Sequence, residues 1–226
     1  MLKIENVDVY GWEAAIRGAR NPMNSWDKAD TRYFSEGAPK LGPNDYKLLR
    51  NLANAGPDHG KYLRMISVTL DVTAPLYWWK EFDTYKVGTV ANSCSTMHKI
   101  HAKEFTPEDF SHEYLFPEFT GTDLVDFVEF DGVRVSPVGV LNLTIDTLNF
   151  YREKFLETKD KRYWWQLIQL LPSSYNQRRT VSLNYQVLKT MYHARKNHKL
   201  DEWRIFCEWI RSLPYSELIT GGDTDA

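Results

Sequence analysis

The chain has 226 residues, a formal net charge of -2 at pH 7, 42% hydrophobic residues and 26% charged residues. These values are ordinary for a globular protein with one sizeable core. The near balance of charge gives no general reason to bind nucleic acid or an anionic membrane. No segment approaches the roughly 18 uninterrupted apolar residues of a membrane-spanning helix. The two cysteines, Cys94 and Cys207, are too few for a disulfide framework. We therefore predict a cytoplasmic protein whose partners include neither nucleic acid nor a membrane.

The N-terminal quarter predicts a strand, two helices and a long connection. Residues 2–9 are typical of a short strand, and residues 11–21 favour a helix that Asn21 and Pro22 end. Residues 22–43 are rich in turn-forming and polar side chains, so they are a candidate loop or lid. Asn44 is predicted to cap a helix that runs to Asn54.

The clearest strand covers residues 66–73, where apolar and polar side chains alternate. Pro75 then suits the first turn of a helix that carries Trp78, Trp79 and Phe82. Further on, the pair Asp131-Gly132 predicts a hairpin within residues 127–135.

The C-terminal third is helical by pattern. One amphipathic helix is predicted over residues 144–170, and Pro172 would end it. Two more helices are predicted, over residues 180–197 and 200–213. The final segment, residues 220–226, is predicted to be a disordered tail.

Two segments carry a more specific pattern. The first is APLYWWKEFDTYKVGTVANSCSTMHKI, residues 74–100, and the second is LPSSYNQRRTVSLNYQVLKTMYHARKNHKLDEWRIF, residues 171–206. The chain resembles the flavin-dependent thymidylate synthases, whose corresponding segments read A-P-x-F-x-x-R-Q-x-x-R-H-R-x-x-S-x-N-E-x-S-x-R-Y and L-P-x(11)-N-x-R-x-L-x-x-F-x-x-L-R. The match needs no gap within either segment, but many of the charged positions differ.

The resemblance implies an α+β subunit, with an antiparallel sheet flanked by helices and a helical C-terminal third, as a single domain over residues 1–219. It also implies a homotetramer with active sites between subunits. FAD would be the cofactor, NADPH and methylene-tetrahydrofolate the co-substrates, and a pyrimidine deoxynucleotide such as dUMP the substrate. The implied reaction is reductive methylation at C5 of the pyrimidine.

The resemblance also implies roles for individual residues. Arg195 aligns with an arginine that stabilises the uracil ring as an anion, so it is the candidate catalytic residue. The implied cofactor-binding residues are His59, Lys61, Thr84, Tyr85, Lys86, Asn92, Asn184 and Gln186. The implied substrate-binding residues are Glu81, Thr89, Cys94, Ser95, Thr96 and Arg195.

The departures from the family pattern leave a second function open. Thr84, Tyr85 and Lys86 stand where the family has Arg-His-Arg, and threonine does not reproduce the bidentate donor fork of arginine. The family's phosphate-binding arginine aligns near Ile168, so that contact is missing unless Arg162, Arg178 or Arg179 substitutes for it. The alternative function is an inactive scaffold that binds nucleotides or other proteins.

Two weaker chemical patterns were weighed. A thiolate at Cys94 could attack C6 of uracil, but a small packing residue is the simpler interpretation. A metal site could be drawn from Cys94, His98, His101, His112 and Glu113, but their spacing matches no standard zinc pattern. We predict no metal.

Overall fold

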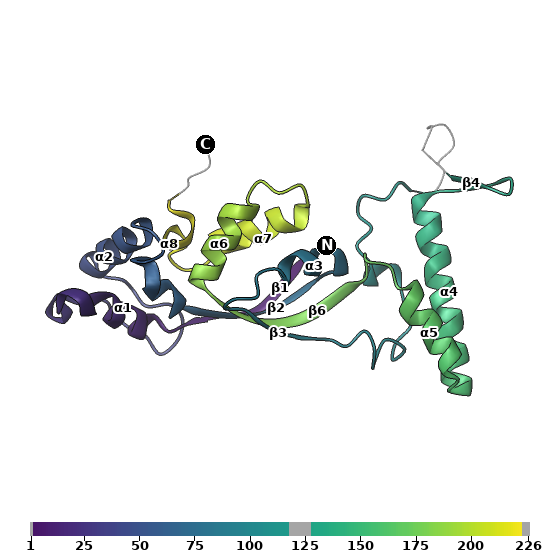
Figure 1. Ribbon diagram of the computed structural model, residues 1–226, viewed down its shortest axis with the longest axis horizontal. Helices are drawn as coiled ribbons and strands as arrows, with labels where there is room; N and C mark the ends of the chain where they lie inside the picture. The colour runs from purple at the N-terminus through teal and green to yellow at the C-terminus, as the bar shows by residue number, and fades with distance from the viewer. Residues whose placement is uncertain (1, 118–127, 223–226) are drawn as a thin grey trace. The chain divides into compact units, whose positions relative to one another are not determined.

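The computed structural model describes residues 2–117 and 128–222 (Figure 1). It is an α+β structure with an antiparallel four-stranded sheet in the order β1-β2-β6-β3. Its strands are β1 (Lys3–Tyr10), β2 (Ser67–Pro75), β3 (Val90–Ser93) and β6 (Asn176–Asn184). A separate hairpin is formed by β4 (Val128–Phe130) and β5 (Val133–Val135). The predicted α+β class with an antiparallel sheet is confirmed.

Helices occur in both halves of the described chain. The α-helices are α1 (Trp12–Arg20), α2 (Pro43–Asn54), α3 (Leu76–Phe82), α4 (Pro137–Thr158), α5 (Lys161–Leu170), α6 (Tyr185–Arg195), α7 (Asp201–Arg211) and α8 (Glu217–Thr220). Short 3₁₀ turns are η1 (Asn21–Met23), η2 (Trp26–Lys28), η3 (Gly60–Arg64) and η4 (Pro107–Asp109).

The chain forms two compact units, and each is assembled from separate stretches of sequence. Unit 1 contains Thr73–Trp79 and Ser93–Arg178, and unit 2 contains Leu2–Val72, Lys80–Asn92 and the chain from Arg179 onward. The single domain over residues 1–219 stays a prediction.

In unit 2 the helices α6, α7 and α8 pack around one another, and α8 also packs on α2. The strand β2 supplies the alternation that the sequence predicted, with Val68, Leu70 and Val72 all at most 1% exposed. On the opposite face of β2, the carboxylate of Asp71 accepts hydrogen bonds from Asn6 of β1 at 2.8 Å and from Thr180 of β6 at 2.5 Å. These bonds join three neighbouring strands and help to fix their register.

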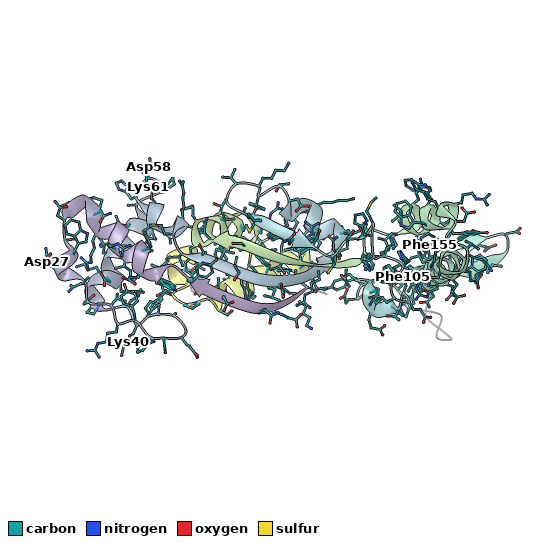
Figure 2. All side chains as sticks on the ribbon, turned by 90° about the horizontal axis from the view of Figure 1, so that it is seen from below. Asp27, Lys40, Asp58, Lys61, Phe105 and Phe155 are labelled. Carbon is teal, nitrogen blue, oxygen red and sulfur yellow. The ribbon has the colours of Figure 1, made fainter. Side chains whose placement is uncertain are left out.

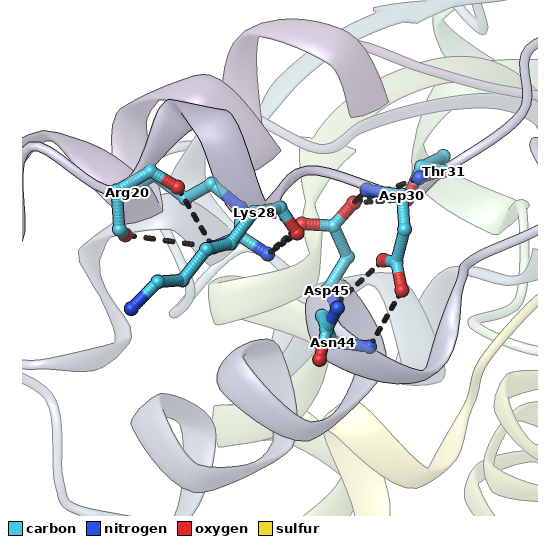
Figure 3. Close-up of polar contacts among 7 residues, drawn as sticks. Arg20, Lys28, Asp30, Thr31, Asn44 and Asp45 are labelled. Atoms are coloured by element: carbon cyan, nitrogen blue, oxygen red, sulfur yellow. Dashed lines mark hydrogen bonds and ion pairs between the residues drawn. The ribbon is translucent and has the colours of Figure 1, made fainter.

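A buried ion pair joins α1 to α2 in unit 2 (Figure 3). Arg20 and Asp45 have side chains that are 4% and 0% exposed, and the Nη2 of Arg20 lies 2.6 Å from Oδ1 of Asp45. The other carboxylate oxygen of Asp45 accepts hydrogen bonds from the amides of Asp30 and Thr31 and from the Thr31 hydroxyl. The first half of the candidate loop or lid of residues 22–43 is therefore tied to this pair, through Lys28 O on Arg20 and through Thr31 on Asp45.

The predicted cap of α2 is wrong. The helix begins at Pro43 after Gly42, and the carboxylate of Asp30 accepts the amides of Asn44 at 2.9 Å and Asp45 at 3.0 Å. The side chain of Asp30, 14 residues before Asn44, therefore caps the helix in place of Asn44. Gly42 is needed because a Cβ there would lie 2.2 Å from Cγ of Asp30.

Unit 1 has its own apolar core beneath α4 and α5. Its buried residues are Ile100, Phe105, Phe110, Leu141, Ile145, Leu148 and Leu167. The predicted hairpin is confirmed, since Asp131 and Gly132 adopt positive φ angles of 50° and 75° between β4 and β5. Positive φ at both central residues is what a two-residue turn of this hand requires.

Two helix predictions in the C-terminal half are corrected. The helix expected over residues 144–170 begins earlier, at Pro137, and is split where Lys159 adopts a φ of 58° and Asp160 caps α5. The helix expected over residues 180–197 begins only at Tyr185, because the strand β6 continues to Asn184.

The end of the chain contains a helix that the sequence did not predict. Thr220, which was placed in the disordered tail of residues 220–226, is 5% exposed in α8. Residues 223–226 of that tail lie outside the described part of the chain.

Candidate functional site

A cavity of about 480 Å³ lies in unit 2 between the segment after α3 and the start of α6. Its lining residues are Arg64, Thr84, Tyr85, Lys86, Val87, Gly88, Asn184, Gln186, Val187 and Thr190. Five of the eight predicted cofactor-binding residues are among them, namely Thr84, Tyr85, Lys86, Asn184 and Gln186. The two separate sequence motifs therefore meet at one cavity, which we call the first cavity.

The junction of β6 and α6 positions the amides of this cavity. Asn184 has extended backbone angles and caps α6, because its side-chain oxygen accepts the amide of Val187 at 3.1 Å. This hydrogen bond occupies the side-chain oxygen of Asn184, while the two N–H donors of the same carboxamide can still donate to a ligand. Gln186 and Thr190 follow one turn apart on α6, on the same face of the helix.

The opposite wall comes from the turn that ends α3. The amide and the hydroxyl of Thr84 both donate to the carbonyl of Glu81, at 3.1 and 2.7 Å. The hydroxyl of Thr89 donates to the carbonyl of Tyr85. Thr84 and Thr89 thus shape the backbone on either side of Lys86.

Arg195 is held next to this wall by three neighbours. Its Nε donates to the hydroxyl of Tyr85 at 2.9 Å, and its Nη1 donates to Oε2 of Glu81 at 2.7 Å. Its guanidinium carbon lies 4.8 Å from the ring centroid of Trp203 and 5.6 Å from that of Tyr85. The side chain is 19% exposed. Tyr85 therefore connects the candidate catalytic arginine to the first cavity.

One carboxylate oxygen of Glu81 contacts several of the polar groups around Arg195. Oε2 of Glu81 also accepts Nε1 of Trp203 at 3.0 Å and lies 3.4 Å from Nε2 of His198. Because the negative charge of Glu81 lies next to the guanidinium, Arg195 offers less net positive charge to a ligand. Glu81 was predicted as a substrate-binding residue, and that role stays a prediction.

Sequence reasoning missed Trp203 and His198 as members of this cluster. Both lie beyond the family pattern, which ends at Arg195, and Trp203 was included only in the helix predicted over residues 200–213. The signal that could have found His198 is its position three residues after Arg195, close to the end of α6.

A second hollow of about 470 Å³ shares Gln186 and Thr190 with the first cavity. Lys189 lines it and donates to the carbonyl of Ala53 at 2.6 Å. Burial lowers the pKa of the Lys189 ammonium group below its usual value. Lys189 and Arg64 are the two lining cations that the sequence analysis did not select.

The predicted flavin-loop residues His59 and Lys61 lie close to these hollows but line neither of them. A Cβ placed on Gly60, between them, would lie 3.8 Å from Oε1 of Gln186. The side chains of His59 and Lys61 are both exposed, and Figure 2 labels Lys61.

The predicted residues Asn92, Cys94, Ser95 and Thr96 are not among those that line the first cavity. Asn92 is exposed on β3. Cys94, Ser95 and Thr96 belong to unit 1, where the amide of Cys94 donates to the carbonyl of Arg178 at 2.9 Å and its carbonyl accepts Gln177 at 2.7 Å. The hydroxyl oxygen of Ser95 accepts the amides of Met97 and His98, so Ser95 shapes a turn.

Two arginines considered as substitutes for the missing phosphate contact form ion pairs. Arg179 lies 2.8 Å from Asp83, and Arg162 lies 2.6 Å from Asp160. Within residues 2–117 and 128–222, no group of three or more His, Cys, Asp or Glu side chains is placed to hold a metal ion. In the same ranges, no helix is both long and apolar enough to cross a membrane.

Comparisons with known proteins agree with the fold. Neither a protein-family model nor a curated protein matches the sequence. A crystal structure of thymidylate synthase X (ThyX) from Helicobacter pylori with FAD and dUMP matches with a TM-score of 0.66 at 16% identity, over 98% of each chain. The UMP/dUMP methylase PolB from Streptomyces cacaoi, bound with 5-Br dUMP, matches with a TM-score of 0.62 at 16% identity, over 98% of this chain and 95% of that one. The chain therefore has the fold of the flavin-dependent thymidylate synthases, in a divergent form.

Proposed function

We propose that this chain binds FAD in the first cavity and methylates a pyrimidine nucleotide such as dUMP at C5. The observation that carries the proposal is that both sequence motifs supply the lining of one cavity, with Arg195 attached to that lining through Tyr85. The ThyX neighbour was crystallised with FAD and dUMP, and the PolB neighbour is a UMP/dUMP methylase.

The donor set of the first cavity fits an anionic cofactor with a polar ring. Arg64 and Lys86 bring positive charge for a pyrophosphate, and Asn184 and Gln186 bring amide groups for the edge of a flavin ring. FAD, when bound, would accept hydride from NADPH and deliver reducing equivalents, while methylene-tetrahydrofolate would carry the one-carbon unit.

The protein would contribute orientation and charge to this reaction. A pyrimidine carbonyl that accepts a hydrogen bond from Arg195 would have negative charge stabilised on its ring. Glu81 and Tyr85 would fix the direction of the guanidinium through the two bonds described above. A homotetramer acting in the cytoplasm is part of the same proposal.

An inactive nucleotide-binding or protein-interaction scaffold is the second candidate. The contact between Glu81 and Arg195 favours it, because an arginine already paired with a carboxylate is a weaker stabiliser of a new anion. Conversion of dUMP to dTMP by the purified protein, with FAD, NADPH and methylene-tetrahydrofolate present, would exclude the scaffold.

Retention of FAD is the first test of the proposal. After FAD is added and the excess is removed by gel filtration, we expect the wild-type protein to keep the visible absorption bands of a flavin. The double variant Arg64→Gln and Lys86→Gln should lose most of the flavin, because each charge-assisted contact contributes about 1.5–3 kcal/mol. Lys47→Gln changes an exposed lysine that does not line the first cavity and should keep the flavin. A colourless wild-type protein would contradict the proposal.

Gly88 gives a second test of the same cavity. Its φ is +82°, and an added Cβ would lie 3.0 Å from Cγ2 of Val187 and 3.3 Å from Nδ2 of Asn184. We expect Gly88→Ala to displace the amide of Asn184 and to lower the amount of flavin retained. Gly37→Ala is the matched control, because Gly37 has a φ of +80° with no atom within 4 Å of the added Cβ. Both variants should lose about 1–2 kcal/mol of stability from backbone strain, and equal flavin retention in the two would argue against a role for Asn184.

A further inference from the structure

Unit 1 contains a hollow that the proposed reaction does not use. It has a volume of about 270 Å³ and is lined by Met97, His98, His101, Phe155, Lys161 and Trp164. Two hydrogen bonds fix its walls, from Nε1 of Trp164 to the carbonyl of Met97 and from Nε of Arg152 to the carbonyl of His101, both at 3.1 Å. The hollow is thus built from the segment before Ala102, the end of α4 and the start of α5, and we call it the α4–α5 hollow.

Aromatic rings form much of its wall. The rings of His101 and Phe155 meet edge to face with centroids 4.9 Å apart, and Figure 2 labels Phe155 on α4. The indoles of Trp164 and Trp165 are 4.8 Å apart, and Trp165 is 42% exposed. Nδ1 of His101 is buried and makes no hydrogen bond with any residue that the structure describes. The hollow therefore offers aromatic surface for stacking, and a buried polar atom without a partner in the described residues lies in its wall.

The surroundings of the hollow carry an excess of positive charge. Nζ of Lys159 lies 5.9 Å from the ring centroid of Phe155, and Nζ of Lys161 lies 5.5 Å from that of Trp165. Burial and the charges of Lys159, Lys99 and Arg152 lower the pKa of the His101 imidazole below its usual value. Lys99, Lys159 and Lys161 form no ion pair with a carboxylate in the described part of the chain.

The neighbouring carboxylates do not neutralise these lysines. Asp160 is paired with Arg162 at 2.6 Å, and Glu157 is paired with Lys154 at 3.1 Å. Lys161 lies beside the indoles, Lys159 lies beside Phe155, and the charge of Lys99 acts on His101. Positive charge next to aromatic rings fits a ligand that combines several negative charges with a flat ring.

We propose that the α4–α5 hollow binds a nucleoside triphosphate. The base would stack on the indole of Trp164 or Trp165, and Lys99, Lys159 and Lys161 would contact the phosphates. Stacking of a base on an aromatic side chain and lysine contacts to phosphate are the two contributions that proteins commonly combine for such ligands. The residues that line the hollow are not among those that line the first cavity, so the two sites can be tested separately.

Calorimetric titration of the full-length protein with ATP at low salt tests this proposal. We expect ATP to bind at least tenfold more tightly than adenosine, which lacks the phosphates, and than inorganic tripolyphosphate, which lacks the base. Equal binding of tripolyphosphate and ATP would reduce the site to an anion patch and overturn the proposal. A mixed-sequence single-stranded oligonucleotide that binds tenfold more tightly than ATP would overturn it as well.

Variants decide whether the ligand sits in this hollow. The double variant Lys159→Gln and Lys161→Gln changes two exposed lysines and should weaken ATP binding at least thirtyfold. Trp164→Leu should weaken it about tenfold through lost stacking. Lys47→Gln, which changes an exposed lysine of unit 2 that lines neither site, is the control and should leave the affinity for ATP unchanged. Wild-type affinity in the double lysine variant would overturn the proposal, even if Trp164→Leu failed to fold.

Discussion

Asp45→Asn is expected to lower the free energy of unfolding by about 3–5 kcal/mol, because it leaves the guanidinium of Arg20 buried without its counter-charge. Asp45 is fully buried, and both of its carboxylate oxygens are in use. For a chain of this length the loss corresponds to a fall of roughly 6–20 °C in Tm. Thermal and urea unfolding of the variant and the wild type would measure it.

The control for this variant is Asp27→Asn. Asp27 lies in η2 near the same connection, but its side chain is exposed, and Figure 2 labels it. We expect Asp27→Asn to change the free energy of unfolding by less than about 0.5 kcal/mol. If Asp45→Asn behaved like Asp27→Asn, the ion pair would not hold α1 and α2 together.

The same carboxylate gives the stability of the protein a defined dependence on pH. Burial opposes ionisation of Asp45, but hydrogen bonds from Thr31, the Asp30 amide and Arg20 outweigh it and hold its pKa below the usual value. A lowered pKa in the folded state stabilises the protein fully above the pKa of the unfolded chain, about 3.9. This contribution is lost as the pH falls from about 4 through the lowered pKa. Asp45→Asn should lack this part of the acid-induced loss of stability.

Arg195→Gln is expected to lower the rate of C5 methylation by about 10²–10³ if the proposed function holds. Glutamine cannot supply the charge or the donor fork of the guanidinium, and removal of one such donor from a developing anion typically costs about that factor. The measurement is dTMP formation from dUMP under saturating FAD, NADPH and methylene-tetrahydrofolate. The flavin content of the variant must be recorded, since only a fall in turnover with flavin retained reports on Arg195.

Lys199→Gln provides the comparison for Arg195→Gln. Lys199 is an exposed cation four residues further on, and it takes no part in the contacts of the Arg195 cluster. Its variant should keep wild-type turnover. Activity of Arg195→Gln within about threefold of the wild type would remove Arg195 from the mechanism.

The local sequence pattern was sufficient to predict some elements of the fold and insufficient to predict others. The alternation along β2 and the Asp131-Gly132 turn were predicted because each depends on adjacent residues. The cap on α2 depends on Asp30, which is distant in sequence, and the break after α4 depends on Lys159, a residue type that rarely adopts a positive φ. The cap requires a contact between residues distant in sequence, and the break requires an unusual backbone angle, so neither follows from a local hydrophobic pattern.

The candidate site shows the same division. The family pattern selected Tyr85, Lys86 and Asn184, and the structure places them on one cavity. Trp203 and His198 could not be found in this way, because both lie beyond the end of the family pattern at Arg195, although both contact Glu81 in the structure. The effect of replacing the family glutamine by Glu81 could be recognised only once its carboxylate was seen to contact Arg195.

The interleaving of the two units along the chain has a consequence for synthesis on the ribosome. The stretches of unit 1 have all been made once Arg178 has emerged, but unit 2 still lacks α6 and α7 at that stage. Trp203 and Phe206 of α7, followed by Leu218 and Ile219 of α8, are fully buried in unit 2 and are synthesised late. Domains usually fold in the order in which they are synthesised. Here we expect the unit that contains the N-terminal strand to finish folding second, with its apolar surfaces uncovered until the last helices leave the exit tunnel.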